Sequence, residues 1–317
     1  MMEINNVKLD WESILERYIT HLETEFPNLD VREKMRPIIN DLNSNKLKSR
    51  VIIGSGKVAA YAFFTPAGFY SDRVYGNIGF LSEETFSQDR MSNLLKWLVS
   101  EAAVSRSLLM IDRVFNMPPL GEEIFTNMGF RLLRRIRMER RMDILVPETQ
   151  AVEGFKFEGL EHLNVNAFSD AEYEAFSTVP DSVLMGKLME ERHNFTRFIF
   201  SESDIYGSIN TRASRTCYFG EVLAGAVLVS NQRNEASGTD PLILTVFVKK
   251  EFRNRGIARN MLLQSLHELK SQGFGVVHLY VNALSDARNL YSSLGFRESD
   301  EKFTEELHYL PATVNGP

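Results

Sequence analysis

The chain has 317 residues, a length that predicts about two domains. Hydrophobic residues make up 44% of it and charged residues 25%, which is typical of a soluble globular protein with an ample core. The formal net charge of -6 argues against a nucleic-acid-binding protein.

The cysteine content and the N-terminus exclude further classes. Cys217 is the only cysteine, so an intrachain disulfide and a cysteine zinc site are both excluded. His267 and His278 have no partner at metal-ligand spacing, and we expect no metal. The first 18 residues are amphipathic and acidic without an apolar signal core, and no apolar run approaches transmembrane length. These features predict a cytoplasmic protein without membrane contact.

The first half of the sequence predicts helices and strands in alternation. Apolar residues recur at helical spacing over 10–26, and a second helix is expected over 30–42. The elements expected next are a hairpin over 51–64, a strand over 74–81, a helix over 88–104, a strand over 108–114, and a short helix before Gly129-Phe130.

Two segments of this half allow a second interpretation. The GSGK turn at 54–57 is similar to a nucleotide-binding loop, but that loop needs Gly at Val51 and Ser or Thr at Val58, so a hairpin turn is favoured. The basic run 131–141 is a candidate nucleic-acid patch, but it has no aromatic platform. A final strand with one solvated face is therefore favoured, followed by a linker at 147–150.

The second half repeats the order of the first. The expected elements are a strand at 154–157, a helix over 166–177, an amphipathic segment capped by Asp181, a hairpin over 216–230, a polar loop over 231–240, a strand over 242–248, a helix from Gly256, a strand over 276–281, and a short helix reaching Tyr291. The shared order predicts two similar domains in tandem.

The turn that follows the strand over 242–248 is suited to phosphate. A helix N-terminus presents unpaired N–H groups and the positive end of the helix dipole. Gly256 lets the backbone approach a pyrophosphate closely, and the small Ala258 keeps that approach clear. Arg253 and Arg255 would add charge-assisted hydrogen bonds. The turn therefore predicts a diphosphate site.

These residues also resemble a known family. Arg253-x-x-Gly256-x-Ala258 after a strand resembles the pyrophosphate loop of the GCN5-related N-acetyltransferase (GNAT) superfamily. The run 287–291, followed by Leu294-Gly295-Phe296, resembles the next motif of that superfamily.

The resemblance is detailed over residues 242–296. It implies an α/β (α+β) fold of two tandem GNAT-type domains, each a mixed, mostly antiparallel sheet with flanking helices and a central, splayed parallel pair. Residues 1–147 would be a degenerate copy without cofactor, and residues 151–317 a catalytic domain that binds acetyl-CoA.

The resemblance also implies which residues hold acetyl-CoA. The main chain of Val246, Phe247 and Val248 would bind the pantetheine arm and the carbonyl oxygen. Tyr291 would protonate the departing CoA sulfur, and its reference pKa of about 10 makes it a neutral donor. A tyrosine that only packs on the cofactor is the alternative. The residues implied for the pyrophosphate are Arg253, Asn254, Arg255, Gly256, Ile257 and Ala258.

Other parts of the site follow the family pattern less closely. The family commonly has Asn where this chain has Leu284, and Asn282 is the nearest polar substitute. Asp240 and Glu221 are the nearest acidic candidates for the general base. Cys217 is a candidate acyl carrier, although a thiol in an apolar strand more often packs in a core.

The first copy lacks the corresponding residues. Aligning the two copies places Thr85 opposite Arg253, Gln88 opposite Gly256, Arg90 opposite Ala258 and Phe125 opposite Tyr291. This copy has no glycine at the phosphate position and no phenol for proton donation. Its expected role is to complete a substrate cleft or to bury an interface.

The expected function is an acetyl-CoA-dependent N-acetyltransferase that acts on a small-molecule amine, in a monomer or homodimer. Candidates to line the acceptor pocket are Met185, His193 and Phe195, although such residues at this spacing more often belong to a core. The alternatives are a protein or peptide N-acetyltransferase and a non-catalytic acyl-CoA-binding protein. The acceptor cannot be named from the fold.

Overall fold

The computed structural model describes residues 9–25, 29–112, 114–118, 122–201, 207–234, 238–299 and 304–311. The chain forms two compact units. The first unit consists of Met1–Leu132 and Glu306–Pro317, and the second of Leu133–Glu305. Their boundaries differ from the division at 147–151 that the sequence predicts.

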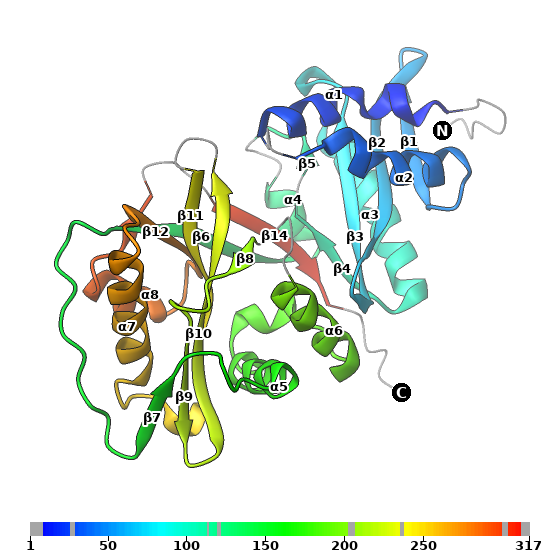
Figure 1. The fold of residues 1–317 in the computed structure, drawn as a ribbon. Coiled ribbons are helices and arrows are strands. Elements are labelled where there is room, and N and C mark those ends of the chain that lie inside the picture. The colour runs from blue at the N-terminus through cyan, green and yellow to red at the C-terminus, as the bar shows by residue number, and fades with distance from the viewer. Residues whose placement is uncertain are drawn as a thin grey trace, which may run out of the picture. The chain divides into compact units, whose positions relative to one another are not determined.

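The first unit is a sheet with helices on both faces (Figure 1). Its helices are α1 (Trp11–Glu25), α2 (Val31–Asn43), η1 (Glu83–Thr85), α3 (Gln88–Ser105) and α4 (Glu122–Asn127). Its strands are β1 (Ser49–Gly54), β2 (Lys57–Ala67), β3 (Tyr70–Phe80), β4 (Leu108–Ile111), β5 (Val114–Phe115) and the greater part of β14 (Thr304–Leu310). The strand order is β1-β2-β3-β4-β14, and β5 pairs with β3.

The alternation of side chains along β2 builds the two layers of this unit. Successive residues of a strand point to opposite faces of the sheet. Ala62 and Phe64 pack in a core with residues of α3, whereas Tyr61 and Phe63 pack in a second core with residues of α1 and α2. One strand therefore serves both hydrophobic cores.

The second unit is a mixed sheet flanked by helices. Its strands are β6 (Arg131–Arg141), β7 (Phe155–Glu158), β8 (Ser208–Ile209), β9 (Arg215–Phe219), β10 (Val222–Asn234), β11 (Gly238–Val248), β12 (Val276–Asn282) and β13 (Arg297–Glu298). Its helices are α5 (Val165–Phe176), η3 (Pro180–Leu184), α6 (Met189–Phe200), η4 (Lys250–Phe252), α7 (Ile257–Ser271) and α8 (Ala287–Ser293).

The sheet of the second unit has the order β7-β9-β10-β11-β12-β6. Its neighbouring strands are antiparallel except for β11 and β12, which are parallel. The helices α7 and α8 lie on one side of the sheet, and α5 and α6 lie on the other (Figure 1). The predicted fold class, a mixed and mostly antiparallel sheet around a central parallel pair, is confirmed.

The strand over 131–141 lies mostly in a different unit from the one expected. It was predicted to finish the first domain, but β6 pairs with β12 from Arg135 to Arg141, inside the second unit. Met138, Met142 and Val146 are buried in the core of that unit. The hydrogen bonds and the buried apolar residues therefore assign the segment after residue 132 to the second unit.

A buried arginine fixes this segment. Arg140 is 1% exposed, and its guanidinium donates to the carbonyl oxygens of Leu294 at 2.7 Å, Arg141 at 3.1 Å and Leu145 at 3.0 Å. Burial lowers the pKa of Arg140. The residue joins the end of β6 to the turn after α8.

Two more expectations of the sequence need correction. Residues 231–240 do not form a loop throughout, because β10 continues to Asn234 and pairs through to Gly238 at the start of β11. Residues 304–310, for which no element was expected, form β14, and its last residues pair with β4 in the first unit. No helix of the described residues is both long and apolar enough to cross a membrane.

We expect Arg140→Met to destabilise the protein by about 2–4 kcal/mol, because one buried and two partly buried carbonyl groups lose their donor. Urea unfolding measures this change. The matched control is Arg141→Met, since the neighbouring arginine is exposed and pairs with the exposed Asp143. Equal effects of the two substitutions would contradict the role given to Arg140.

Candidate functional site

The parallel strands β11 and β12 separate shortly after they pair. Their ladder consists of Leu242 with His278 and Ile243 with Leu279 among the described residues. Beyond Ile243 and Leu279 the strands diverge, so the following residues of β11 have no ladder partner on that side in the part of the chain that the structure describes. Unpaired backbone N–H and C=O groups need partners, and a bound molecule can provide them.

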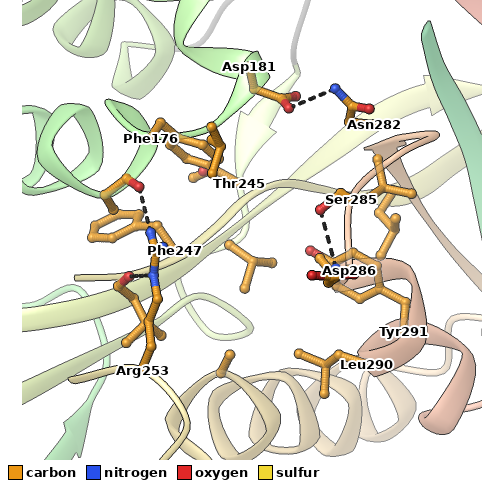
Figure 2. A pocket seen from close by; sticks show the side chains of 18 of the residues that line it. Phe176, Asp181, Thr245, Phe247, Arg253, Asn282, Ser285, Asp286, Leu290 and Tyr291 are labelled. Carbon is orange, nitrogen blue, oxygen red and sulfur yellow. Dashed lines mark hydrogen bonds between the residues drawn. The ribbon is translucent and has the colours of Figure 1, made fainter. Parts of the chain in front are cut away.

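A cavity of about 760 Å³ occupies this separation. Its wall is formed by β11 and β12, by the first turn of α7, by α8 and by η3, as Figure 2 shows for part of it. Ligand sites in proteins typically have volumes of roughly 300–1,000 Å³. The cavity is therefore of a size that holds a small molecule or a large part of a coenzyme.

The start of α7 opens into this cavity. Gly256 is the N-cap residue with φ of 79°, a left-handed conformation that glycine adopts without strain, and no side chain of the described residues caps the helix there. A Cβ atom added at Gly256 would meet nothing within 4 Å. Unpaired amides at the positive end of a helix attract phosphate, so these residues fit the diphosphate of a coenzyme.

The three arginines near this helix start have different roles. Arg253 lines the cavity, but its guanidinium donates to the carbonyl oxygens of Val248 at 3.0 Å and Ala175 at 2.6 Å. It therefore links the end of β11 to α5 (Figure 2). Arg255 does not line the cavity and lies over the Phe155 ring, 5.9 Å from its centroid.

Arg259 was missed by the sequence analysis. It lies in the first turn of α7, lines the cavity, and donates to the Ser293 hydroxyl on α8 at 2.9 Å. Arg259 directly follows the motif Arg253–Ala258 in the sequence, and this position could have indicated that it lies at the same site. Of the predicted cofactor residues, all except Arg255 line the cavity: Val246, Phe247, Val248, Arg253, Asn254, Gly256, Ile257 and Ala258.

Tyr291 also lines the cavity, from α8. The side chain is mostly buried, with 7% of the residue exposed, and its ring packs edge-on against Phe296. Burial raises the pKa of the phenol, the nearby Asp181 raises it further, and Arg135 partly opposes both. The hydroxyl therefore stays protonated at neutral pH and can act as a proton donor.

The acidic residues of the cavity are not the ones that the sequence suggested. Asp181 and Asp286 line it, whereas Asp240 and Glu221 do not. Asp240 lies beside His278, with 3.7 Å between the carboxylate and the imidazole. Asp181 was expected to cap a helix, but its carboxylate instead accepts a hydrogen bond from Asn282 at 3.2 Å (Figure 2).

A buried carboxyl lies next to the cavity without lining it. Burial raises the pKa of Glu172, on α5, to about 7, and the influence of the nearby Thr245 side chain opposes part of the rise. Thr245 is a cavity residue of β11. Glu172 therefore titrates close to neutral pH behind the wall of the cavity.

The remaining candidates lie outside the cavity. Cys217 is fully buried, and burial raises the pKa of its thiol to about 12, which agrees with packing in the core. Met185, His193 and Phe195 do not line the cavity, and His193 instead bonds to Asp170 at 2.9 Å. Among the described residues no group of three or more His, Cys, Asp or Glu side chains is arranged to hold a metal.

The corresponding region of the first unit is closed. At the start of α3 the Ser87 hydroxyl accepts a hydrogen bond from the Arg90 amide, and the Arg90 guanidinium donates to the Thr85 carbonyl at 2.7 Å. Moreover, β5 pairs with β3 at Ile78 and Gly79, so the parallel pairing of β3 continues after β4. In the first unit the start of α3 is therefore occupied by side chains and the edge of β3 is paired with β5, whereas the start of α7 and the edge of β11 are open in the second unit.

The comparisons with known proteins agree with this geometry. Residues 214–308 match the family model described as an acetyltransferase (GNAT) domain. Residues 214–308 therefore form a GNAT-type domain, a kind of domain that supports acyl transfer in general. No curated protein is similar enough in sequence to give a match.

Solved structures share the fold over most of the chain. A GCN5-related N-acetyltransferase from Sphaerobacter thermophilus has 17% identity and a TM-score of 0.56, with 96% of this chain and 93% of that chain covered. A functionally unknown conserved protein from Staphylococcus epidermidis has 14% identity and a TM-score of 0.51, with 84% and 95% covered. A fungal GCN5-related glucosamine N-acetyltransferase region has 12% identity and a TM-score of 0.52, with 83% and 33% covered.

The raised pKa of Glu172 predicts a pH dependence of stability. Between the usual pKa of 4.5 and about 7, the folded protein keeps this proton while the unfolded chain releases it, so stability falls as pH rises through this range and is constant above it. The loss from pH 5 to pH 8 is about 2–3 kcal/mol.

Urea unfolding of the wild type and of Glu172→Gln at both pH values isolates this contribution. The amide does not titrate, so the variant loses less stability than the wild type over the same interval. Parallel losses in the two proteins would show that Glu172 has an ordinary pKa.

Proposed function

We propose that the chain is an acetyl-CoA-dependent N-acetyltransferase that transfers the acetyl group to a primary amine of a small molecule. The observation that carries the proposal is the uncapped start of α7, which opens into the same cavity as the diverging strand β11 and Tyr291. The GNAT domain at residues 214–308 supports acyl transfer in general. The amine acceptor and the individual roles below are our proposal.

The first turn of α7 binds the diphosphate in this proposal. The amides of Gly256, Ile257 and Ala258 supply the donors, and Arg259 adds a positive charge from the same turn. Arg253 acts as a positioning residue, because its hydrogen bonds hold the turn against α5 and β11. Arg255 has no direct part in binding.

The diverging segment of β11 holds the coenzyme arm. The main-chain groups of Val246, Phe247 and Val248 lie along the cavity and can bond to the amides of an extended chain and to the acyl oxygen. Acetyl-CoA supplies an activated acyl group and a thiol leaving group. The amine nitrogen forms the new bond to the acyl carbon while the carbon–sulfur bond breaks.

Tyr291 supplies the proton that this exchange requires. Its hydroxyl stays protonated at neutral pH because burial opposes its ionisation. It donates a proton to the departing sulfur, and the proton that the amine nitrogen loses passes through solvent to the tyrosinate, so that the products are a neutral amide and a neutral thiol and the phenol is restored.

The first unit takes no part in cofactor binding in this proposal. The start of its helix α3 is occupied by the side chains of Ser87 and Arg90. At the position where the second unit has Tyr291, the first unit has the buried Phe125, whose ring stacks on the His308 ring with 3.8 Å between the ring centroids. One molecule of acetyl-CoA per chain is therefore expected.

Gly256→Glu is expected to weaken CoA binding by about tenfold or more, because a carboxylate would stand beside the bound diphosphate. Isothermal titration calorimetry measures the dissociation constant. The matched control is Gly273→Glu, at the other end of α7, where φ is also positive at 83° and an added Cβ also meets nothing within 4 Å. Equal affinities in the two variants would place the diphosphate elsewhere.

Tyr291→Phe is expected to lower kcat by about tenfold or more with little change in the KM for acetyl-CoA, since only the proton donor is removed. Thiol release under single-turnover conditions measures the chemical step. Tyr218→Phe, on β9 outside the cavity, serves as the control. A chemical step within twofold of wild type in Tyr291→Phe would rule out the acid role.

A further inference from the structure

One part of the cavity wall is a row of polar side chains that coenzyme binding leaves unused. Asn282, at the end of β12, is the register partner of Arg135 on β6. Residues directly opposite each other on neighbouring strands direct their side chains to the same face. Asp181 continues the row, because its carboxylate accepts the hydrogen bond from the Asn282 amide.

The orientation of Asn282 is fixed from both ends. Its side-chain oxygen accepts from the Leu284 amide at 2.9 Å, and its nitrogen donates to Asp181 at 3.2 Å. Asn282 is 5% exposed and all three members of the row line the cavity. Asn282 therefore binds the Asp181 carboxylate directly, and Arg135 lies opposite Asn282 on the neighbouring strand.

The row is separated from the diphosphate end of the cavity. In Figure 2 Asp181 and Asn282 lie at the opposite side of the view from Arg253, with Thr245 and Tyr291 also at the cavity wall. Asp181 and Arg135 both act electrostatically on Tyr291, in opposite senses. Both charges therefore lie close to the proposed proton donor, where the acceptor has to reach the acyl group.

Arg135 can exchange its present partner for a ligand. Its guanidinium pairs with Glu305 at 3.1 Å, and the Glu305 side chain is 51% exposed. An ion pair with such an exposed partner is worth little, so an incoming anion can replace it. The Arg135 Nε atom is buried without a hydrogen-bond partner among the described residues.

We propose that this row is the acceptor subsite and that the acceptor is a small amine that also carries an anionic group, a carboxylate or a phosphate. Asp181 binds the amine, and Arg135 binds the anion. The inference rests on the proposed acetyl transfer and adds the class of acceptor to it. Arg135 lies before the segment expected to form the catalytic domain, so the expected domain would have lacked half of this subsite.

Matched acceptors test the inference with the full-length protein. Thiol release from acetyl-CoA is measured with glycine, β-alanine and 4-aminobutyrate against their amides, and with glucosamine 6-phosphate against glucosamine. We expect kcat/KM for the best anionic acceptor to exceed that of its uncharged counterpart at least about tenfold, as expected for a charged hydrogen-bond partner. The two series distinguish a carboxylate from a phosphate.

Variants assign the two ends of the acceptor. Arg135→Gln should abolish the preference, because it lowers kcat/KM for the anionic acceptor of each pair alone. Asp181→Asn should lower kcat/KM for both the anionic and the uncharged acceptor without changing the KM for acetyl-CoA. The ratio of kcat/KM for the anionic acceptor to that for the uncharged acceptor, measured in one variant, does not depend on how much of that protein is folded. The control is Arg137→Gln, two residues along β6, which lies outside the cavity and should keep the preference.

The outcomes separate this inference from the proposed function. Release with equal rates for anionic and uncharged amines, or an unchanged preference in Arg135→Gln, overturns the acceptor class and leaves acetyl transfer intact. No release with any amine from the wild type overturns acetyl transfer itself, and the acceptor class with it.

Discussion

The site depends on the separation of two parallel strands next to the uncapped start of a helix. Parallel strands normally satisfy each other's backbone groups, so ending the ladder at Ile243 and Leu279 leaves donors and acceptors of the described strands that a bound molecule can pair. The first turn of α7 adds unpaired amides and a positive dipole end at the same cavity. These are properties of the backbone, and the side chains around them refine the site.

The two units differ in how they treat this arrangement. Both have two parallel strands joined by a helix, but in the first unit β5 continues the pairing of β3. The Ser87 hydroxyl accepts a hydrogen bond from the Arg90 amide at the start of α3, and the Arg90 guanidinium donates to the Thr85 carbonyl beside it. The helix start and the strand edge therefore differ between the two units, although the order of their elements is similar.

The local features were predictable from the sequence and the partners of the strands were not. Helical and strand periodicity predicted α7, β11 and β12, and the loop at Gly256 indicated where the cavity would lie. The amphipathic pattern of residues 131–141 predicted a strand. It did not indicate which strand this segment would pair with or in which unit it would lie. Residues 231–240 were mistaken for a loop because the far end of a hairpin carries polar residues on both faces.

The directions in which individual side chains point could not be predicted from the sequence either. Arg253 and Arg255 have the same charge and are two residues apart, yet one joins β11 to α5 and the other lies over Phe155. Asp181 is a residue type that commonly caps helices, and nothing near it in the sequence indicates its hydrogen bond with Asn282. Long-range contacts of this kind depend on how distant elements pack, which short-range patterns do not encode.

Amide hydrogen exchange with and without CoA tests the central claim most directly, because it reports on the backbone groups themselves. The account predicts slower exchange at the start of α7 and along β11 from Thr245 to Val248 when CoA is bound, and no change at the start of α3. Protection of α3, or unchanged exchange at α7 under saturating CoA, would contradict it.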